Sequence, residues 1–463
     1  MPTDPHIGDT EEPDAIDAGL LSPVSVGHDG AVSDAAIGGA LIAAETALVR
    51  AWSAVGAAPH EVGELVSQHL GWQGAGHPCV LRGFPLAQLT ADAVSGGNPV
   101  IPLVAVLRER VPESTRSWVH RGATSQDIMD SALMLTAKRA VAEVRLHLDE
   151  TCSALRSFAQ AHRDEVVVAR TLTQQAVPTT VGLRAANWWR GIDRATHRLD
   201  EAASALPAQL AGAGGTLASF AEIGGIDAAR ALPGRFAAEL GLQEPEAPWH
   251  TERWPVTELG DALVQVIDAL GKLAADVTTL SRTEIGELAE GAGGGSSAMP
   301  QKRNPARSVL IRSAAIRAPH LGATLHAASA LAVDERPDGA WHAEWPALRE
   351  LLRAALGASA QARTVAHGLR VDAGAGARNL GRSGGLVLAE RLNLVLGPRI
   401  GPGAVSDLVA RASRGEDLRA ILAADPAVAQ AGVDLDALLD PAQYTGLAAA
   451  LVDELSADRS RTD

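Results

Sequence analysis

Apolar residues recur every three or four positions over long stretches of this chain, which is the period of one face of an α-helix. The clearest run lies between residues 261 and 290, where no proline interrupts the pattern and Gly291 follows it. We therefore predict a helix over residues 261–290, about 45 Å long at about 1.5 Å per residue. Its apolar face would consist of Leu263, Val266, Ile267, Leu270, Leu273, Val277, Leu280, Ile285 and Leu288.

Three further stretches with the same period predict long helices. One begins near Ser125 and extends to about His162, a second begins after Pro178, and a third covers residues 304–331. Long helices with broad apolar faces pack side by side, and strand patterns are few. The sequence therefore predicts an all-α protein built on an extended central bundle of long helices. The second helix would bury Val181, Ala185, Trp189, Ile192 and Leu199.

Changes in composition near Arg116 and Val371 divide the chain into three predicted domains. A smaller helical N-terminal domain would cover residues 19–116, the central bundle 117–370, and a helical C-terminal domain 371–463. We expect residues 1–18, which are acidic and polar, to form a disordered tail. Because such wide apolar faces are hard to bury within one bundle, we expect oligomerisation through the central helices.

Composition excludes several classes of function. The net charge of −15 argues against a nucleic-acid partner, which needs a basic surface. Two cysteines, Cys79 and Cys152, form neither a disulfide framework nor a metal-binding spacing, as is typical of a cytoplasmic protein. The N-terminus lacks the pattern of a signal peptide. No uncharged apolar run reaches the roughly 18 residues of a membrane span.

Residues 293–305 contain the strongest chemical signal of the chain. Three glycines and two serines are followed by Lys302 and Asn304, which lie between Pro300 and Pro305. The chain has 40 Lys plus Arg residues but only two other lysines, Lys138 and Lys272, so an ammonium group here is conspicuous. The spacing does not match a P-loop. We predict a flexible lid that binds an anion, with a purely structural loop as the alternative.

Two other segments are candidates for chemistry. In residues 120–127, Thr124 or Ser125 would cap a helix whose first turn carries Asp127. A helix N-terminus also binds carboxylates, and His120 directly precedes this one, so structural and catalytic roles are equally compatible with its position. Residues 170–178 are read as a polar loop leading into a helix that starts at Pro178. By itself this segment indicates structure rather than function.

Together the three segments resemble the signature regions of the fumarase/aspartase superfamily, which includes adenylosuccinate and argininosuccinate lyases. The stretch from Gly295 to Pro305, GSSAMPQKRNP, is highly specific for that superfamily. Within it, the chain is most similar to bacterial 3-carboxy-cis,cis-muconate cycloisomerases, over nearly everything beyond residue 18. The similar stretches are residues 98–104, 120–127, 248–251, 334–345, 384–390 and 440–441.

This resemblance implies a homotetramer with a core of twenty long helices, in which three subunits contribute one segment each to every active site. It implies no metal and no organic cofactor. Ser296 is the expected proton-transfer residue, acting through a carbanion that is stabilised as an aci-carboxylate, and His120 is the second catalytic candidate. The small polycarboxylate substrate would be bound by Asn98, Arg121, Thr124, Ser125, Gln126, Thr171, Gln174, Gln175, Lys302, Asn304 and Arg336.

Four positions bear on the type of reaction. Lyases that expel an amine or hydroxide commonly place a histidine where Leu172 stands, and adenylosuccinate lyases place another where Asn98 stands. Many cycloisomerases carry histidines at the positions of Gln175 and Gln301. Glutamine forms hydrogen bonds but cannot shuttle a proton near neutral pH.

An amine or hydroxide leaving group needs a general acid, whereas a carboxylate or nitrite departs as a stable anion. The sequence therefore favours lactonisation of 3-carboxy-cis,cis-muconate to 4-carboxymuconolactone. The alternative is a nitrosuccinate-lyase type of elimination that releases nitrite and fumarate. A non-catalytic protein on the same fold is a further alternative, which the presence of Ser296, Lys302 and Asn304 disfavours.

Overall fold

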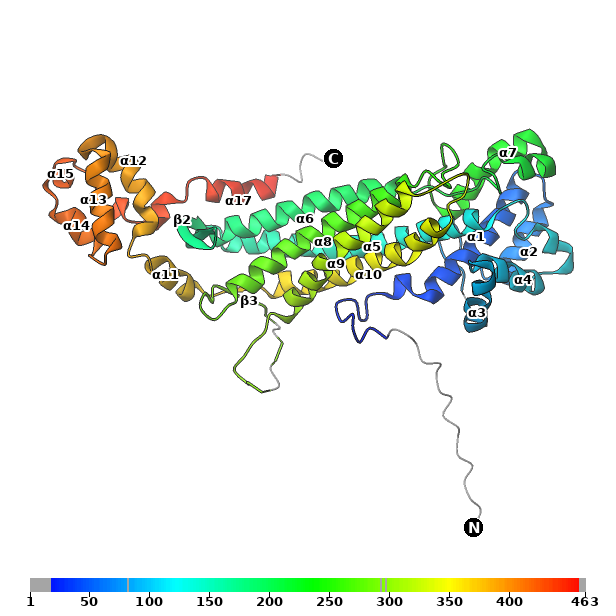
Figure 1. Ribbon diagram of the computed structural model, residues 1–463, viewed down its shortest axis with the longest axis horizontal. Helices are drawn as coiled ribbons and strands as arrows, with labels where there is room; N and C mark the ends of the chain where they lie inside the picture. The colour runs from blue at the N-terminus through cyan, green and yellow to red at the C-terminus, as the bar shows by residue number, and fades with distance from the viewer. Residues whose placement is uncertain (1–17, 81–82, 292–293, 296–297, 458–463) are drawn as a thin grey trace, which may run out of the picture.

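The computed structural model describes residues 18–80, 83–291, 294–295 and 298–457. Within them the chain is an elongated helical molecule, with a central bundle of long helices and smaller helical groups at both ends (Figure 1). The all-α fold predicted from the sequence is confirmed. The expected disordered tail lies outside the described residues except for Ala18.

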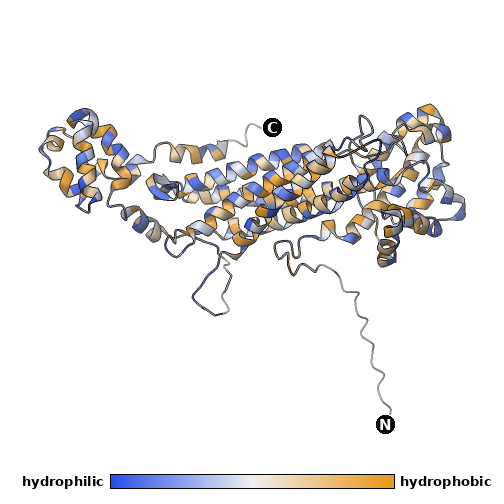
Figure 2. Ribbon diagram, viewed as in Figure 1, coloured by the Kyte–Doolittle hydropathy of each residue, from blue (hydrophilic) through white to orange (hydrophobic). Residues whose placement is uncertain are grey.

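Long amphipathic helices form the central bundle. Hydrophobic and hydrophilic positions alternate along them (Figure 2), and the faces turned inward are fully buried, as at Leu263, Ile267 and Leu270 of α8. Neighbouring helices pack along their lengths, with α9 between α8 and α10. The bundle consists of α5 (Ser125–Ala161), α6 (Val181–Ser204), α8 (Trp254–Leu280), α9 (Ala306–Ala330) and α10 (Gly339–Gly368).

The prediction for α8 was wrong at both ends. This helix begins at Trp254, with Pro255 in its first turn, and ends at Leu280 rather than at residue 290. Leu288, which continued the apolar period, instead lies buried in the short strand β3 (Leu288–Ala289), paired with β4 (Arg370–Val371). A buried strand that begins a few residues after a helix adds apolar residues that sequence periodicity cannot separate from the helix.

Residues 166–180 form a β-hairpin, which corrects the predicted loop and Pro-started helix. Strand β1 (Val166–Thr171) pairs antiparallel with β2 (Gln174–Thr180), and Pro178 lies opposite Val168 within the ladder. Helix α6 starts at Val181, and the Thr180 hydroxyl accepts a hydrogen bond from the Leu183 amide at 3.1 Å. The turn has no Asn-Gly or Gly-Gly pair, which is the usual sequence signal of a hairpin.

Further helices cover one end of the bundle, next to the start of α5. They are α1 (Asp34–Ala54), α2 (His60–Leu70), α3 (Leu86–Gly96), α4 (Val100–Arg110) and α7 (Ala218–Leu240), with the 3₁₀ turns η1 (Gly30–Val32) and η2 (Glu113–Trp118). In the described part of the chain, only α1 is long and apolar enough to cross a membrane. Its apolar window is 72% buried inside the protein, which identifies α1 as a core helix.

The C-terminal region extends beyond the other end of the bundle and has its own apolar core. Its last helix, α17, returns along α6. The elements are α11 (Ala373–Gly381), η3 (Leu386–Leu388), α12 (Ala389–Ile400), α13 (Pro402–Ser413), α14 (Leu418–Ala424), α15 (Pro426–Gln430), α16 (Leu435–Leu438), η4 (Pro441–Tyr444) and α17 (Ala448–Ala457). The domain boundaries near Arg116 and Val371 stay predictions.

Candidate active site

The first segment, residues 120–127, leads from the N-terminal helices into α5. His120 has a φ of +61°, which is uncommon for a residue with a side chain. Its Nδ1 lies 2.7 Å from Oε1 of Glu45, a fully buried carboxylate of α1. Burial lowers the pKa of His120, but the charges of Glu45 and Asp127 outweigh this effect and raise that pKa above its ordinary value.

Asp127 fixes the start of α5. Its buried carboxylate accepts hydrogen bonds from the backbone amides of Thr124, Ala211 and Gly212, each at 3.0 Å. Nε2 of His250 lies 2.8 Å from Oδ1. The predicted cap is confirmed, because α5 begins at Ser125 with Thr124 as its N-cap. Asp127 does more than complement the helix dipole, since it ties this helix start to the loop before α7.

Two predicted substrate-binding amides are held within the chain. The Gln126 side chain is fully buried and donates to Oδ2 of Asp130 and to the carbonyl of His250. The Asn98 side chain is bonded to the backbone of residues 96 and 100, at the start of α4. These contacts fit a role in holding the segment better than direct contact with substrate.

Arg121 and Arg336 lie at this same end of the bundle. The Arg121 guanidinium stacks over the Trp118 ring at 4.5 Å, and Arg336 donates to the carbonyl of Ala213 at 3.0 Å. Ala213 follows Gly212, whose amide binds Asp127. The structure therefore brings the loop before α10 to the first segment, as the predicted role of Arg336 requires.

A buried ion-pair network lies close to this end, and sequence reasoning missed it. Arg253 binds Asp130 and Glu344, with closest distances of 2.7 Å to each and with all three side chains at most 3% exposed. The Trp341 indole also donates to Asp130 at 2.9 Å. The network connects α5, α8 and α10. Pairing across helices has no period along the chain, so only the similar stretches at residues 248–251 and 334–345 pointed to this region.

The second segment, residues 170–178, comprises the end of β1, the hairpin turn and most of β2. Leu172 and Thr173 both have positive φ, +47° and +70°, and Leu172 is 96% exposed. Thr171 and Gln174 are exposed beside the turn, whereas the Gln175 amide donates to the carbonyl of Asn379 at 2.9 Å.

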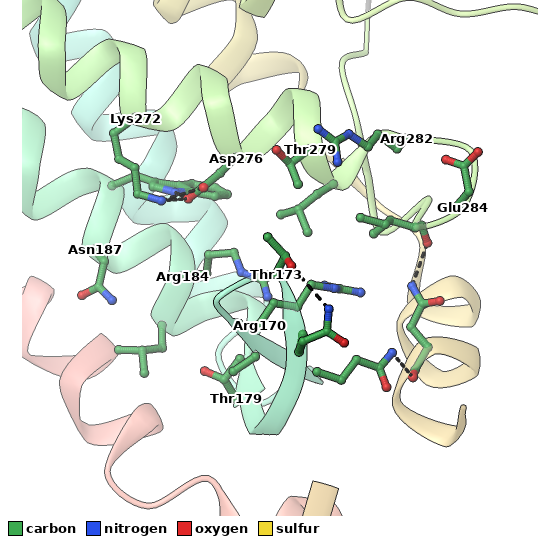
Figure 3. A pocket seen from close by; sticks show the side chains of 18 of the residues that line it. Arg170, Thr173, Thr179, Arg184, Asn187, Lys272, Asp276, Thr279, Arg282 and Glu284 are labelled. Atoms are coloured by element: carbon green, nitrogen blue, oxygen red, sulfur yellow. Dashed lines mark hydrogen bonds and ion pairs between the residues drawn. The ribbon is translucent and has the colours of Figure 1, made fainter. Parts of the chain in front are cut away.

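A cavity of about 700 Å³ lies between this hairpin, α6 and α8. Figure 3 shows side chains that line it. Gln174 and Gln175 line it, together with Arg170, Arg184, Lys272, Asp276, Arg282 and Arg382. Lys272 is paired with Asp276 at 2.6 Å, so this ion pair neutralises part of the positive charge that lines the cavity.

Glu287 holds the hairpin in place. Its buried carboxylate binds Arg170 of β1 at 2.6 Å, Arg184 of α6 at 3.4 Å and the amide of Asn379 at 2.9 Å. Burial raises the pKa of Glu287, but the hydrogen bonds from Arg170 and Asn379 and the charges of both arginines outweigh it, and that pKa lies below its ordinary value. Sequence reasoning did not single out this residue.

The third segment is the loop between β3 and α9, which extends away from the bundle (Figure 1). Gly294 and Asn304 exchange backbone hydrogen bonds of 2.8 and 2.9 Å, which close the base of the loop. Lys302 is exposed, and the Asn304 amide donates to the Gly295 carbonyl at 3.3 Å. Ser296, the predicted proton-transfer residue, lies outside the described residues.

Within one chain, the first segment lies at one end of the central bundle, and the second and third segments lie at the other end. The first segment starts α5, whose 37 residues span about 55 Å, and the hairpin follows the end of that helix. The third segment lies at the hairpin end, since β3 follows Glu287, which binds Arg170. One copy of the chain therefore does not bring all predicted site residues together.

Among the described residues, no group of three or more His, Cys, Asp or Glu side chains is placed to hold a metal ion.

A lyase family model matches residues 29–319. The chain is 42% identical to nitrosuccinate lyase of Streptomyces davaonensis over 95% of this chain and 94% of that protein. It is 42% identical to 3-carboxy-cis,cis-muconate cycloisomerase of Pseudomonas aeruginosa over 81% of this chain and 83% of that one. The 3-carboxy-cis,cis-muconate lactonizing enzyme of Pseudomonas putida superposes with a TM-score of 0.86 at 33% identity, covering 96% and 99% of the two chains.

Proposed function

We propose a specific reaction for this chain, which belongs to the fumarase/aspartase superfamily and is a lyase or a cycloisomerase of that family. The reaction is the elimination of nitrite from a nitrosuccinate-type dicarboxylate, giving fumarate. The observation that carries this proposal is the match to nitrosuccinate lyase, which spans 95% of the chain at 42% identity.

The histidine content of the second and third segments supports a leaving group that departs as a stable anion. The sequence has no histidine between His162 and His197, or between His250 and His320. Gln175 and Gln301 therefore stand in segments that hold no imidazole, and neither can protonate a departing amine or hydroxide. Nitrite needs no such proton.

In the proposed mechanism, Ser296 removes the proton next to a carboxylate of the substrate. The resulting carbanion is delocalised into that carboxylate, to which Lys302 and Asn304 donate hydrogen bonds. The carbon–nitrogen bond then breaks, nitrite leaves with the electron pair, and the carbon–carbon double bond of fumarate forms. Arg121 and Arg336 of a different subunit bind the second carboxylate. Within each subunit, they lie at the end of the bundle opposite to the third segment.

Lactonisation of 3-carboxy-cis,cis-muconate is the second candidate, favoured by the cycloisomerases among the relatives and the solved structures. In it, a substrate carboxylate oxygen attacks the double bond, and the serine delivers a proton to the neighbouring carbon. The same carboxylate-binding groups serve both reactions, because both pass through the same kind of carbanion.

Incubation with each substrate separates the two candidates. We expect nitrosuccinate to yield fumarate and nitrite in a 1:1 ratio, and 3-carboxy-cis,cis-muconate to yield little lactone. Efficient lactone formation without nitrite release would assign the second reaction, and turnover of neither would reject both.

The role of Ser296 is tested by Ser296→Ala. We expect the variant to lose at least about 1,000-fold in kcat, because the proton-transfer group is removed, while its thermal unfolding stays unchanged. Ser297→Ala is the matched control and should keep most of the activity. A Ser296→Ala protein with near-normal turnover contradicts the mechanism.

The proposal includes a homotetramer in which different subunits complete each site. Two observations support it: the segments lie at opposite ends of α5, and the central helices expose Leu146, Val309 and Ile316, each more than half exposed. Such apolar exposure on long helices is typical of an oligomer interface. A cytoplasmic location stays a prediction.

A further inference from the structure

Glu45 is a buried carboxylate without an evident structural need. It lies in α1 among Ala44, Ala47 and Leu48, and its side chain has no exposed area. An ionised carboxylate in such surroundings is costly unless it is paired. In the described chain its one partner is Nδ1 of His120, at 2.7 Å, and Oε2 has none. A group that serves only packing would be replaced by an apolar residue at little cost.

The backbone of His120 is held in a conformation that suits this contact. His120 has a φ of +61° while its Nδ1 contacts Glu45 of α1, and such strained residues occur preferentially at functional sites. The imidazole is 19% exposed. Its other nitrogen, Nε2, has no hydrogen-bond partner among the described residues and is not fully buried. One end of the ring is thus fixed and the other is open.

We propose that Glu45 is the positioning residue of His120: its carboxylate holds the Nδ1–H end of the ring, so that Nε2–H donates a hydrogen bond to an oxygen of the bound anionic substrate. The proposal rests on the proposed function for the substrate. His120 is then a cationic donor to the carboxylate or nitro group, and no proton needs to be transferred from it.

The groups around His120 favour its charged form. Burial and Arg108 lower the pKa of His120, while Glu45, through charge and hydrogen bond, and Asp127, through charge, raise it by more. Asp127 is itself in contact with His250, whose Nε2 lies 2.8 Å from its Oδ1. A carboxylate that orients a histidine also fixes which ring nitrogen carries the proton, as in other carboxylate–histidine pairs.

Residue-specific acylation tests the pair without any substrate. Diethyl pyrocarbonate reacts with neutral imidazole, so its rate at His120 against pH, read by peptide mass spectrometry, gives the pKa of that ring. In the wild type we expect a midpoint above the ordinary value of about 6.5. In Glu45→Gln we expect a midpoint lower by about one to three pH units, the usual effect of losing an opposite charge in contact.

The matched control is Asp261→Asn, which removes the exposed partner of His326, 2.9 Å away. It should leave the His120 midpoint unchanged. A wild-type midpoint at or below about 6.5 overturns the proposal even if no variant folds. An unchanged midpoint in Glu45→Gln does so as well.

Steady-state kinetics separate positioning from a purely structural role. We expect Glu45→Gln to lower kcat/KM by about 10- to 100-fold, the usual cost of removing the partner that orients a functional histidine. The alkaline limb of its pH profile should move to lower pH. A variant with a lower Tm but an unmoved limb would show that Glu45 only holds α1 against the first segment. If the wild type turns over neither substrate, the proposed function fails. The acylation result still shows whether Glu45 and His120 interact as proposed.

Discussion

Glu287 shows at the scale of one residue how a buried carboxylate sets the position of the candidate site. It joins β1, α6 and α11 through Arg170, Arg184 and Asn379. The hairpin is also held by the Gln175 amide, which donates to the carbonyl of Asn379, and by Arg184, which donates to the carbonyl of Val168. Glu287 is thus the charged centre of several contacts that place the turn. Loss of its charge would leave two arginines without their shared partner.

We therefore expect Glu287→Gln to lower the free energy of unfolding by about 3 kcal/mol at pH 7, the cost of breaking a buried pair. Because the pKa of Glu287 is depressed in the folded protein, its contribution is fully present above the unfolded value of about 4.3 and is lost as the pH falls through the folded value. Denaturant melts from pH 3 to 7 measure this difference.

The unfolding free energies of wild type and Glu287→Gln should thus converge at low pH. Glu284→Gln, at an exposed position three residues earlier, is the control and should match the wild type throughout. A constant gap between wild type and Glu287→Gln at all pH values would show that packing, not charge, makes the difference.

At the scale of one element, the hairpin is the clearest departure from the sequence-based prediction. Its β-branched run from Val166 to Val168 is short, and its turn uses Leu172 and Thr173 with positive φ where glycine or asparagine is usual. Each such residue costs roughly 1 kcal/mol or more. A strained turn that also exposes a leucine is explained by function or by contact with another subunit.

Replacing Leu172-Thr173 with Asn-Gly tests this explanation. We expect the Tm to rise by a few degrees, because the strain is relieved, and kcat/KM to fall, because the turn loses the side chains that face the substrate or the neighbouring copy. Calorimetry and a substrate assay on the same preparation measure both. Higher stability with full activity would leave the turn without a functional role.

At the scale of the whole molecule, the length of α5 keeps the first segment away from the second and third. Two subunits with different defects should therefore complement each other. We expect mixed and reassembled Arg121→Ala and Ser296→Ala proteins to recover up to about a quarter of wild-type activity. In a random mixture, about a quarter of the shared sites would contain both an unchanged Arg121 and an unchanged Ser296.

Each inactive variant, dissociated and reassembled alone, is the control and should stay inactive. Recovery only in the mixture requires sites that combine different chains. No recovery, despite mixed tetramers seen by native mass spectrometry, would place a complete site within one chain.

Sequence patterns pointed to candidate segments more directly than to the ends of elements. The specific stretch from Gly295 to Pro305 pointed to the third segment, and Thr124 to the start of α5. Periodicity placed the body of α8 correctly but extended it through Leu288, which is buried in a strand. Buried positions favour apolar residues in helices and in strands alike, so the apolar pattern does not tell which element buries a residue.

The sequence by itself determined that the chain is a helical bundle of this superfamily, because helical period and signature segments are local properties of neighbouring residues. The tertiary structure alone decided which side chains pair across elements: Glu45 with His120, Glu287 with Arg170, and Arg253 with Asp130 and Glu344. These partners lie 75 to 123 residues apart and have no spacing that a sequence could display. Their pairing follows from the way long helices cross, which only the folded chain defines.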